Sequence, residues 1–222
     1  MAFLTFGHPK TITDLRSVVG TRHKPERKDV KIVVIDNDPF PYIDILRNHN
    51  FNIEQLPDLE TLASISTYDI VLCDVQGVGQ KFSETYQGAY LVKEIRKKYP
   101  FKYIISYTAF DNDARYTALL KSADDSIKKD EDTEMWVSKI DSAIESVYDV
   151  EEQWYKIRDY LLSQKVSMFQ VALLENEFVC RIQKKKSFDD FPTAQRKFQI
   201  DKDAKDILLS FIGSAAVKLL LG

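Results

Sequence analysis

The sequence predicts an α/β fold in which a five-stranded, doubly wound parallel sheet is followed by an α-helical C-terminal module. From about residue 30 to residue 149, short runs rich in Val and Ile alternate with segments whose apolar residues recur at helical spacing. Four of these runs end on polar residues, which is typical of parallel strands whose carboxyl ends share one edge. Beyond residue 150 the apolar residues recur at three- and four-residue steps, which favours amphipathic helices.

Strands and helices are expected to alternate along the first part of the chain. The predicted strands cover residues 31–35, 52–56, 70–73, 103–107 and 126–127. The predicted helices cover residues 41–49, 59–65, 88–99, 111–120 and 133–147. Asp58 is placed to cap the second helix, and Pro100 closes the third. Right-handed crossovers between these strands would bring their carboxyl ends side by side.

The rest of the chain divides into a leader and a helical module. Residues 1–29 hold an expected short helix near 14–19 and then a basic, polar linker. An apolar stripe from Trp154 to Ile182 indicates one long helix or a helical pair. A final apolar helix needs a covering surface, and packing on the long helix or on a second subunit is favoured over insertion at a membrane surface. The predicted domains are a leader over 1–29, a sheet domain over 30–149, and a dimerisation or partner-binding module over 150–222.

Composition narrows the class of protein. The chain has 222 residues and a net charge of −3, so no strong field favours nucleic acid or an anionic membrane. The two cysteines, Cys73 and Cys180, are too few for a disulfide framework, and reduced thiols in the cytoplasm are the expected state. No signal-peptide core is expected near Met1, and the apolar stretch 207–221 is shorter than the ~20 residues of a membrane-spanning helix.

Acids, an amide, a hydroxyl and an amine follow the predicted strands. In chain order these residues are Asp36, Asn37, Asp38, Asp74, Thr108 and Lys129. Mg²⁺ prefers hard oxygen ligands and is commonly held by one or two carboxylates together with phosphate. A carboxylate can attack phosphorus, while an ammonium and a hydroxyl bind the remaining phosphoryl oxygens. The sequence therefore predicts a small metal and phosphoryl pocket at one edge of the sheet.

Residues 30–149 resemble the receiver domain of bacterial response regulators. The family pattern has an acidic pair after the first strand and a phospho-acceptor Asp after the third. Ser or Thr followed by Ala comes after the fourth strand, and Lys comes after the fifth. The matching residues here, in the same order, are Asp36-Asn37, Asp74, Thr108-Ala109 and Lys129. The stretches 88–96 and 122–125 resemble the family's third helix and its approach to the lysine.

The resemblance implies a role for each matched residue. Asp74 would accept a phosphoryl group from a histidine kinase or another phosphodonor, with Thr108 and Lys129 binding the phosphoryl oxygens. Mg²⁺ would be held by Asp36, Asn37, Asp74 and the backbone carbonyl of Gln76, with Asp38 as a further candidate ligand.

Several positions depart from the family pattern. Asn37 carries no charge where an acid is usual, so metal affinity should fall, and the loop after Asp74 is several residues longer than usual. Ser126 stands where many receivers carry a switch aromatic, and Asp130 replaces the usual proline after the lysine. These differences affect the residues that receivers use for conformational switching more than those that carry the phosphorylation chemistry.

Simpler structural roles remain open for the same residues. Asp74 could cap the turn after its strand, the residues around Asp36 could simply form a turn, and the Thr108 hydroxyl could bond only to backbone. Lys128 beside Lys129 leaves the register of the lysine open.

Three functions follow from this reading. The first is a regulator, not an enzyme, that is phosphorylated on Asp74 and gives its output through dimerisation or protein contacts of residues 150–222. The second is a degenerate receiver that acts as a constitutive scaffold. The third is a transcriptional regulator, for which the tail lacks a helix-turn-helix signal.

Overall fold

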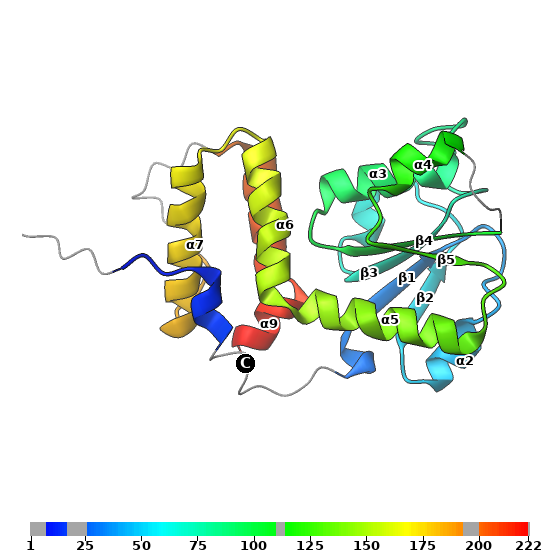
Figure 1. Ribbon diagram of the computed structural model, residues 1–222, viewed down its shortest axis with the longest axis horizontal. Coiled ribbons are helices and arrows are strands. Elements are labelled where there is room, and N and C mark those ends of the chain that lie inside the picture. The colour runs from blue at the N-terminus through cyan, green and yellow to red at the C-terminus, as the bar shows by residue number, and fades with distance from the viewer. Residues whose placement is uncertain (1–7, 17–25, 110–113, 193–199, 222) are drawn as a thin grey trace, which may run out of the picture. The chain divides into compact units, whose positions relative to one another are not determined.

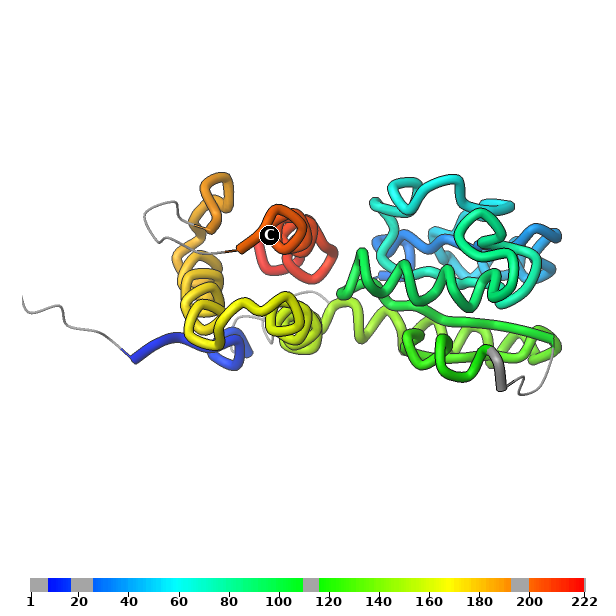
Figure 2. The backbone as a smooth tube through the Cα atoms, turned by 90° about the horizontal axis from the view of Figure 1, so that it is seen from above, coloured from blue at the N-terminus to red at the C-terminus, as the bar shows by residue number. Residues whose placement is uncertain are grey.

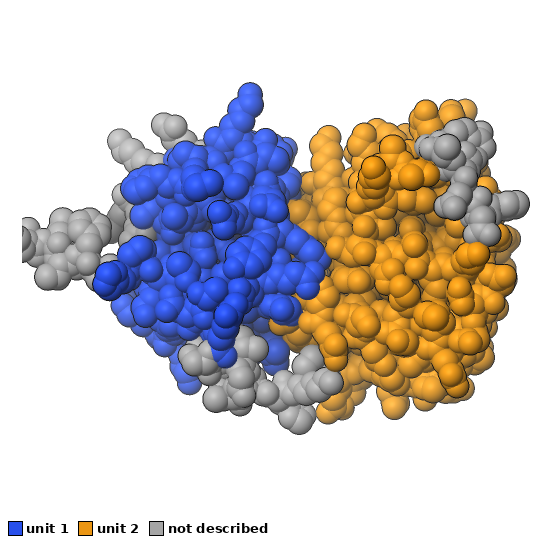
Figure 3. Space-filling model, viewed as in Figure 1, with its two compact units in different colours: residues 1–23, 149–222 blue, residues 24–148 orange. Residues whose placement is uncertain are grey.

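The computed structural model describes residues 8–16, 26–109, 114–192 and 200–221. The chain forms two compact units (Figure 3). One unit comprises residues 24–148 and is called here the sheet unit. The other comprises residues 1–23 together with 149–222 and is called the helical unit.

The sheet unit contains one five-stranded parallel sheet with strand order β2-β1-β3-β4-β5. The strands are β1 Lys31–Ile35, β2 Asn52–Leu56, β3 Ile70–Asp74, β4 Tyr103–Thr108 and β5 Asp125–Lys128. This is the flavodoxin-like order, whose topological switch point lies between β1 and β3. The predicted fold class is therefore confirmed, and ligand chemistry is expected where these two strands end.

Burial explains the composition of the strands. Every residue of the central strand β3 is buried, as are four of the five residues of β1. Both strands are therefore apolar runs, apart from Lys31 at the start of β1 and Asp74 at the end of β3. The edge strand β5 is mostly exposed or half-buried, with only Ile127 fully buried. Because β5 pairs with a neighbouring strand on one side only, its exposed positions hold polar residues.

Helices cover both faces of this sheet. They are α2 Ile43–Asn48, α3 Gln87–Lys98, α4 Ala114–Leu120 and α5 Thr133–Tyr148, with the 3₁₀ turns η2 Arg27–Asp29 and η3 Leu62–Ile65. Figure 1 shows α3 and α4 on one face, and α2 and α5 on the other. The α-helix predicted over 59–65 is instead the short turn η3. Asp58 does not cap it, because its carboxylate accepts the N–H groups of Leu59 and Gly79 at 2.7 Å each.

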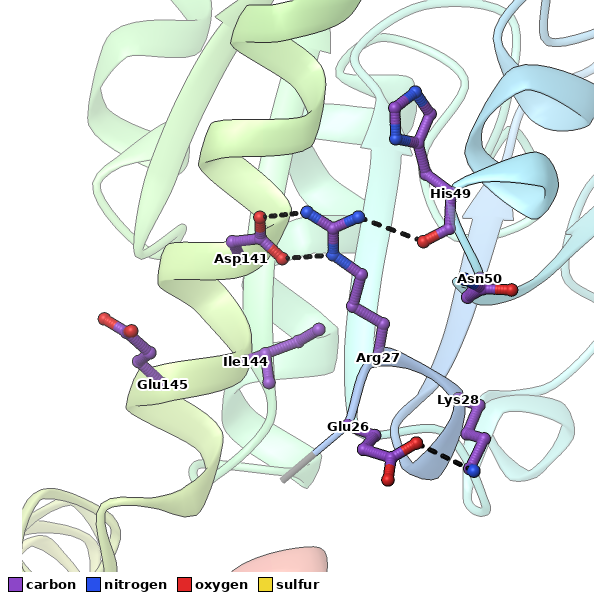
Figure 4. A pocket seen from close by; sticks show the side chains of 8 residues that line it. All are labelled: Glu26, Arg27, Lys28, His49, Asn50, Asp141, Ile144 and Glu145. Atoms are coloured by element: carbon purple, nitrogen blue, oxygen red, sulfur yellow. Dashed lines mark hydrogen bonds and ion pairs between the residues drawn. The ribbon is translucent and has the colours of Figure 1, made fainter. Parts of the chain in front are cut away.

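Arg27 joins three parts of the sheet unit. Its guanidinium donates two hydrogen bonds to Asp141 of α5, at 2.8 and 2.6 Å, and one to the carbonyl of His49 at 3.0 Å (Figure 4). The same group lies 4.5 Å from the ring centroid of Phe51. Arg27, His49 and Asp141 line a polar pocket beside α5, and the contacts of Arg27 hold η2 against the rest of the sheet unit.

The helical unit contains four α-helices and a 3₁₀ turn among its described residues. They are η1 Ile12–Leu15, α6 Val150–Ser163, α7 Met168–Gln183, α8 Lys202–Ile212 and α9 Ala215–Leu221. The apolar stripe is a helical pair, because Lys165 adopts a left-handed φ of 63° and Ser167 caps α7 by accepting the N–H of Gln170. The final apolar stretch is also divided, at Gly213 and Ser214.

The N-terminal segment is part of this unit. Ile12 and Leu15 are buried, and η1 lies against α6 and α7 (Figure 2, blue beside yellow). The backbone N–H of Ile12 donates to Glu175 at 2.8 Å, and Arg16 forms two hydrogen bonds with Glu151 at 2.8 and 2.9 Å. Residues 17–19 of the helix predicted near 14–19, and 20–25 of the predicted linker, lie outside the described residues.

The core of the helical unit is aromatic. Trp154 of α6 stacks on Phe178 of α7 with ring centroids 5.4 Å apart, and Phe211 of α8 contacts both rings. Within the described ranges, no helix is both long and apolar enough to cross a membrane.

Candidate functional site

The carboxyl edge of the sheet brings together groups that are far apart in the sequence. Asp36 follows β1, Asp74 is the last residue of β3, and Lys129 follows β5. The register pairs Asp74 with Tyr107 of the neighbouring strand β4. These side chains meet because parallel strands end on the same edge.

The two carboxylates share one ammonium group. Lys129 Nζ lies 2.6 Å from Asp74 Oδ2 and 3.3 Å from Asp36 Oδ2. Asp36 is 2% exposed and Asp74 is 4% exposed, whereas Lys129 is half-buried. Asp36, Asp74 and Lys129 are called here the acid–lysine cluster. It is Lys129, and not Lys128, that reaches the carboxylates.

Charge in the acid–lysine cluster is unbalanced. Burial raises the pKa of the Asp74 carboxyl, and the charge of Asp36 adds to this, while Lys129 and the N–H of Gln76 oppose it. Burial lowers the pKa of Lys129, but the hydrogen bond to Asp74 and the charges of both acids outweigh burial, so the net shift is upward. With both acids ionised, two negative charges face one positive charge, which favours the entry of a further cation.

Backbone and side-chain donors fix the orientation of each carboxylate. Asp36 Oδ1 accepts the N–H of Asp38 at 2.9 Å, and Asp36 Oδ2 accepts the hydroxyl of Tyr107 at 2.9 Å. Asp74 Oδ1 accepts the N–H of Gln76 at 3.2 Å. With Lys129 included, and among the residues that the structure describes, Asp36 has three donors and Asp74 has two. Because a carboxylate offers about four lone-pair sites, both acids retain capacity for another ligand.

These observations fit a magnesium ion better than a transition metal. Among the residues that the structure describes, no group of three or more His, Cys, Asp or Glu side chains is arranged to hold a metal. An ion bound by Asp36 and Asp74 would therefore draw its other ligands from amide, carbonyl or water oxygens. Mg²⁺ usually keeps several waters and needs only one or two carboxylates.

The other predicted metal ligands lie around this pair. Asn37 is exposed, and its amide oxygen lies over Gly77: a Cβ added at Gly77 would come 2.0 Å from Asn37 Oδ1. Gly77 has a φ of +79°, which a residue without a Cβ adopts easily. The Asp38 side chain is exposed, and its backbone N–H holds Asp36. Gln76 lies two residues after Asp74, and its N–H donates to the Asp74 carboxylate.

Thr108 is placed by the backbone of β4. It is the last residue of that strand, its side chain is half-buried, and its carbonyl accepts the N–H of Lys129 at 3.0 Å. Tyr42 also holds the segment after β5, because its hydroxyl donates to the carbonyl of Glu131 at 2.7 Å. Thr108 and Tyr42 thus fix the backbone that carries Lys129.

Two residues of the site were not found by sequence reasoning. Tyr107 was read as part of an apolar strand, although its position beside Thr108 is a signal that its hydroxyl reaches the edge. Gln55 of β2 donates to the carbonyls of Asp36 and Asp38 at 3.0 and 2.6 Å and accepts the N–H of Phe40 at 3.0 Å. A glutamine in an edge strand carries no such signal, because its partners are backbone atoms of a distant loop.

Comparison with known proteins gives similarity only at the level of structure. No protein-family model matches the chain, and no curated protein matches it. Several solved structures are similar to part of the chain. A CheY-like response regulator receiver domain protein from Methanospirillum hungatei has 20% identity and a TM-score of 0.44, over 52% of this chain and 94% of that one. A two-component response regulator from Clostridium difficile has 21% identity and a TM-score of 0.44, over 52% and 96%.

The receiver domain of NtrX from Brucella abortus is similar to the same extent, with 21% identity and a TM-score of 0.42 over 52% of this chain and 98% of that one. The chain resembles receiver domains. The strand order establishes the flavodoxin-like fold without these similarities, and the function is argued below from the acid–lysine cluster.

Proposed function

We propose that this protein is a response-regulator-like switch in which Asp74 accepts a phosphoryl group. One observation carries the proposal: two buried carboxylates from β1 and β3 share the ammonium of Lys129 at the switch point of the sheet. This cluster offers a nucleophile, a cation for the phosphoryl oxygens and an electrostatic preference for a metal. The role is regulatory, and the phosphodonor is a histidine kinase or a small phosphorylated molecule.

The transfer step uses an oxygen of Asp74 as the nucleophile. That oxygen forms a bond to phosphorus while the bond from phosphorus to the donor's leaving atom breaks, and the electron pair stays on the leaving atom. For a phosphohistidine donor the leaving atom is an imidazole nitrogen. Lys129, which already contacts Asp74, would bind a phosphoryl oxygen, and the Thr108 hydroxyl would bind another.

The residues proposed to hold Mg²⁺ are Asp36, Asp74, Asn37 and the carbonyl of Gln76, with Asp38 adding negative charge nearby. Bound there, Mg²⁺ would neutralise phosphate charge and stabilise the charge that develops in the transition state. The uncharged amide of Asn37 makes this a weaker site than one with a third carboxylate, so millimolar Mg²⁺ is the appropriate test concentration.

Phosphorylation would change the charge at the edge of the sheet. A phospho-group carries about −1.5 to −2 charges near neutral pH, and it would compete with Asp36 for Lys129. We propose that this competition biases a two-state equilibrium of the loops around Thr108 and Lys129. The output would pass through the helical unit, by dimerisation or by binding a partner protein.

The test is the intact mass of the protein after incubation with Mg²⁺ and phosphoramidate. We expect the wild type to gain one phosphoryl group, Asp74→Asn to gain none, and Lys129→Met to gain it more slowly. Asp44→Asn is the matched control, because Asp44 is a surface carboxylate of the same unit whose side chain is 86% exposed. An adduct that persists in Asp74→Asn, or a wild type that gains no phosphate, would contradict the proposal.

A constitutive scaffold is the competing function, and Asn37 favours it. Its amide lies over Gly77 and supplies no charge where receivers usually carry an acid. The solution mass of the full chain, measured with and without beryllium fluoride and Mg²⁺, separates the two functions. A change of association state with the phosphate mimic supports the switch, and an identical state with and without it supports the scaffold.

A further inference from the structure

Tyr107 places a hydroxyl inside the candidate site. The residue is 1% exposed, and its hydroxyl donates to Asp36 Oδ2 at 2.9 Å. Asp36 therefore receives a hydrogen bond from β4, which pairs with the strand that ends on Asp74.

The ring of Tyr107 is held as firmly as its hydroxyl. It packs against Phe40 and Trp136, with centroid separations of 5.7 and 5.5 Å, and the ring of Trp136 meets it edge-on at 80°. Lys129 Nζ lies 5.5 Å from the centroid of the same ring. Tyr107 thus contacts both an acid and the ammonium of the acid–lysine cluster.

Trp136 of α5 lies at the centre of this packing. Its side chain is fully buried and contacts the rings of Phe40, Tyr42 and Tyr107 at 5.1, 5.4 and 5.5 Å. Its indole N–H has no hydrogen-bond partner in the part of the chain that the structure describes. Because the Trp136 ring packs directly against the rings of Tyr107 and Phe40, its fluorescence should change when either ring moves.

We propose that Tyr107 is a positioning residue that orients Asp36 for Mg²⁺ binding, and that Trp136 reports on this arrangement. The inference rests on the proposed function, because Asp36 is a ligand only if the cluster binds Mg²⁺. Groups that hydrogen-bond to a metal ligand restrict its rotation, and their removal typically weakens metal affinity by about 10- to 100-fold. Tyr107 is such a group: without its hydroxyl, Asp36 Oδ2 loses the contact at 2.9 Å and keeps the longer one to Lys129 Nζ at 3.3 Å.

The experiment uses the full chain with Trp154→Phe, so that Trp136 is the sole tryptophan. Its fluorescence is titrated with MgCl₂ in this background and in the same background with Tyr107→Phe. The matched control is Tyr68→Phe, because Tyr68 of the same unit also donates its hydroxyl to a carboxylate, Glu54 Oε2, at 2.8 Å, but in an exposed hydrogen bond. We expect about 10- to 100-fold weaker Mg²⁺ binding in Tyr107→Phe and an unchanged dissociation constant in Tyr68→Phe.

A second measurement separates positioning from a loss of stability. The rate of phosphorylation by phosphoramidate is compared for Tyr107→Phe alone and in an Asp36→Asn background. If Tyr107 acts through Asp36, the substitution slows the reaction in the wild type and has little further effect once Asp36 is altered.

The outcomes distinguish this inference from the proposed function. If the wild type binds Mg²⁺ and is phosphorylated but Tyr107→Phe binds Mg²⁺ within twofold of it, only the positioning role is overturned. An equal slowing by Tyr107→Phe in the presence and absence of Asp36 overturns it as well. If the wild type neither binds Mg²⁺ nor gains phosphate, the proposed function fails and this inference fails with it.

Discussion

Leu15 offers a sharp test of how the chain is organised, because it links the N-terminal segment to the C-terminal helices. Leu15 is 0% exposed in η1, and its segment is tied to α7 and α6 through Ile12 and Arg16. Leu15→Ala removes three carbon groups, worth about 2.4 kcal/mol at ~0.8 kcal/mol each. The hydrogen bonds around η1 limit collapse of the cavity, so the total cost should lie near 3–4 kcal/mol.

The chain contains a separate tryptophan for each unit, which makes the assay specific. Trp136 lies in the sheet unit and Trp154 in the core of the helical unit, and the sequence has two tryptophans in all. With Trp136→Phe as background, urea unfolding followed by fluorescence reports on Trp154. A loss of about 3 kcal/mol should lower the urea midpoint by about 1–3 M for a typical dependence on urea.

Thr13→Ala is the control, because Thr13 is exposed on the same 3₁₀ turn. Its effect should stay within about 0.5 kcal/mol. If Leu15→Ala moves the Trp154 transition no more than Thr13→Ala does, then η1 is not part of the core of the helical unit and the reasoning is wrong.

Three further predictions concern the sheet unit. Lys102 is 2% exposed, donates to the carbonyls of Ser66 and Tyr68, and has its pKa lowered to about 8 by burial. The unfolded chain keeps that proton up to about pH 10.4. The free energy of unfolding of the wild type should therefore rise by about 2 kcal/mol relative to that of Lys102→Met between pH 8 and 10. The same pH dependence for both proteins in urea unfolding would contradict this. Arg27→Ala and Asp141→Ala should each lower the free energy of unfolding by about 1–2 kcal/mol, because the bidentate pair is only partly exposed. A double-mutant cycle should give a coupling energy of about 1 kcal/mol between the two residues. Additive effects of the two substitutions would contradict this prediction. Gly77→Ala should lower the free energy of unfolding by about 1–2 kcal/mol, because φ is +79° and the new methyl meets the Asn37 amide; a thermal midpoint equal to that of the wild type would exclude this strain.

The sheet was predictable because its signals are local. β1 begins and ends as expected, since a buried parallel strand is marked by an apolar run. β3 and β4 each extend one residue beyond the prediction, to the polar residues Asp74 and Thr108. The segment 59–65 was predicted wrongly as an α-helix, because the carboxylate of Asp58 bonds to Gly79 in a loop that sequence periodicity cannot place. In the helical unit, the break near Lys165 depends on one left-handed residue, which an apolar stripe does not reveal.

The sequence by itself determined which polar groups reach the carboxyl edge of the sheet, because the residue that ends or follows each parallel strand lies at that edge. Asp36 and Asp74 follow from that rule, whereas the structure decided that the lysine is Lys129 and not Lys128. The roles of all three residues in phosphorylation remain a prediction. Only the tertiary structure decided that the Tyr107 hydroxyl faces Asp36, because a strand residue's hydrogen-bond partner depends on the neighbouring strands and not on its own sequence. The tertiary structure likewise decided that Leu15 is buried among helices far along the chain, since contacts over such separations arise from packing and leave no local pattern.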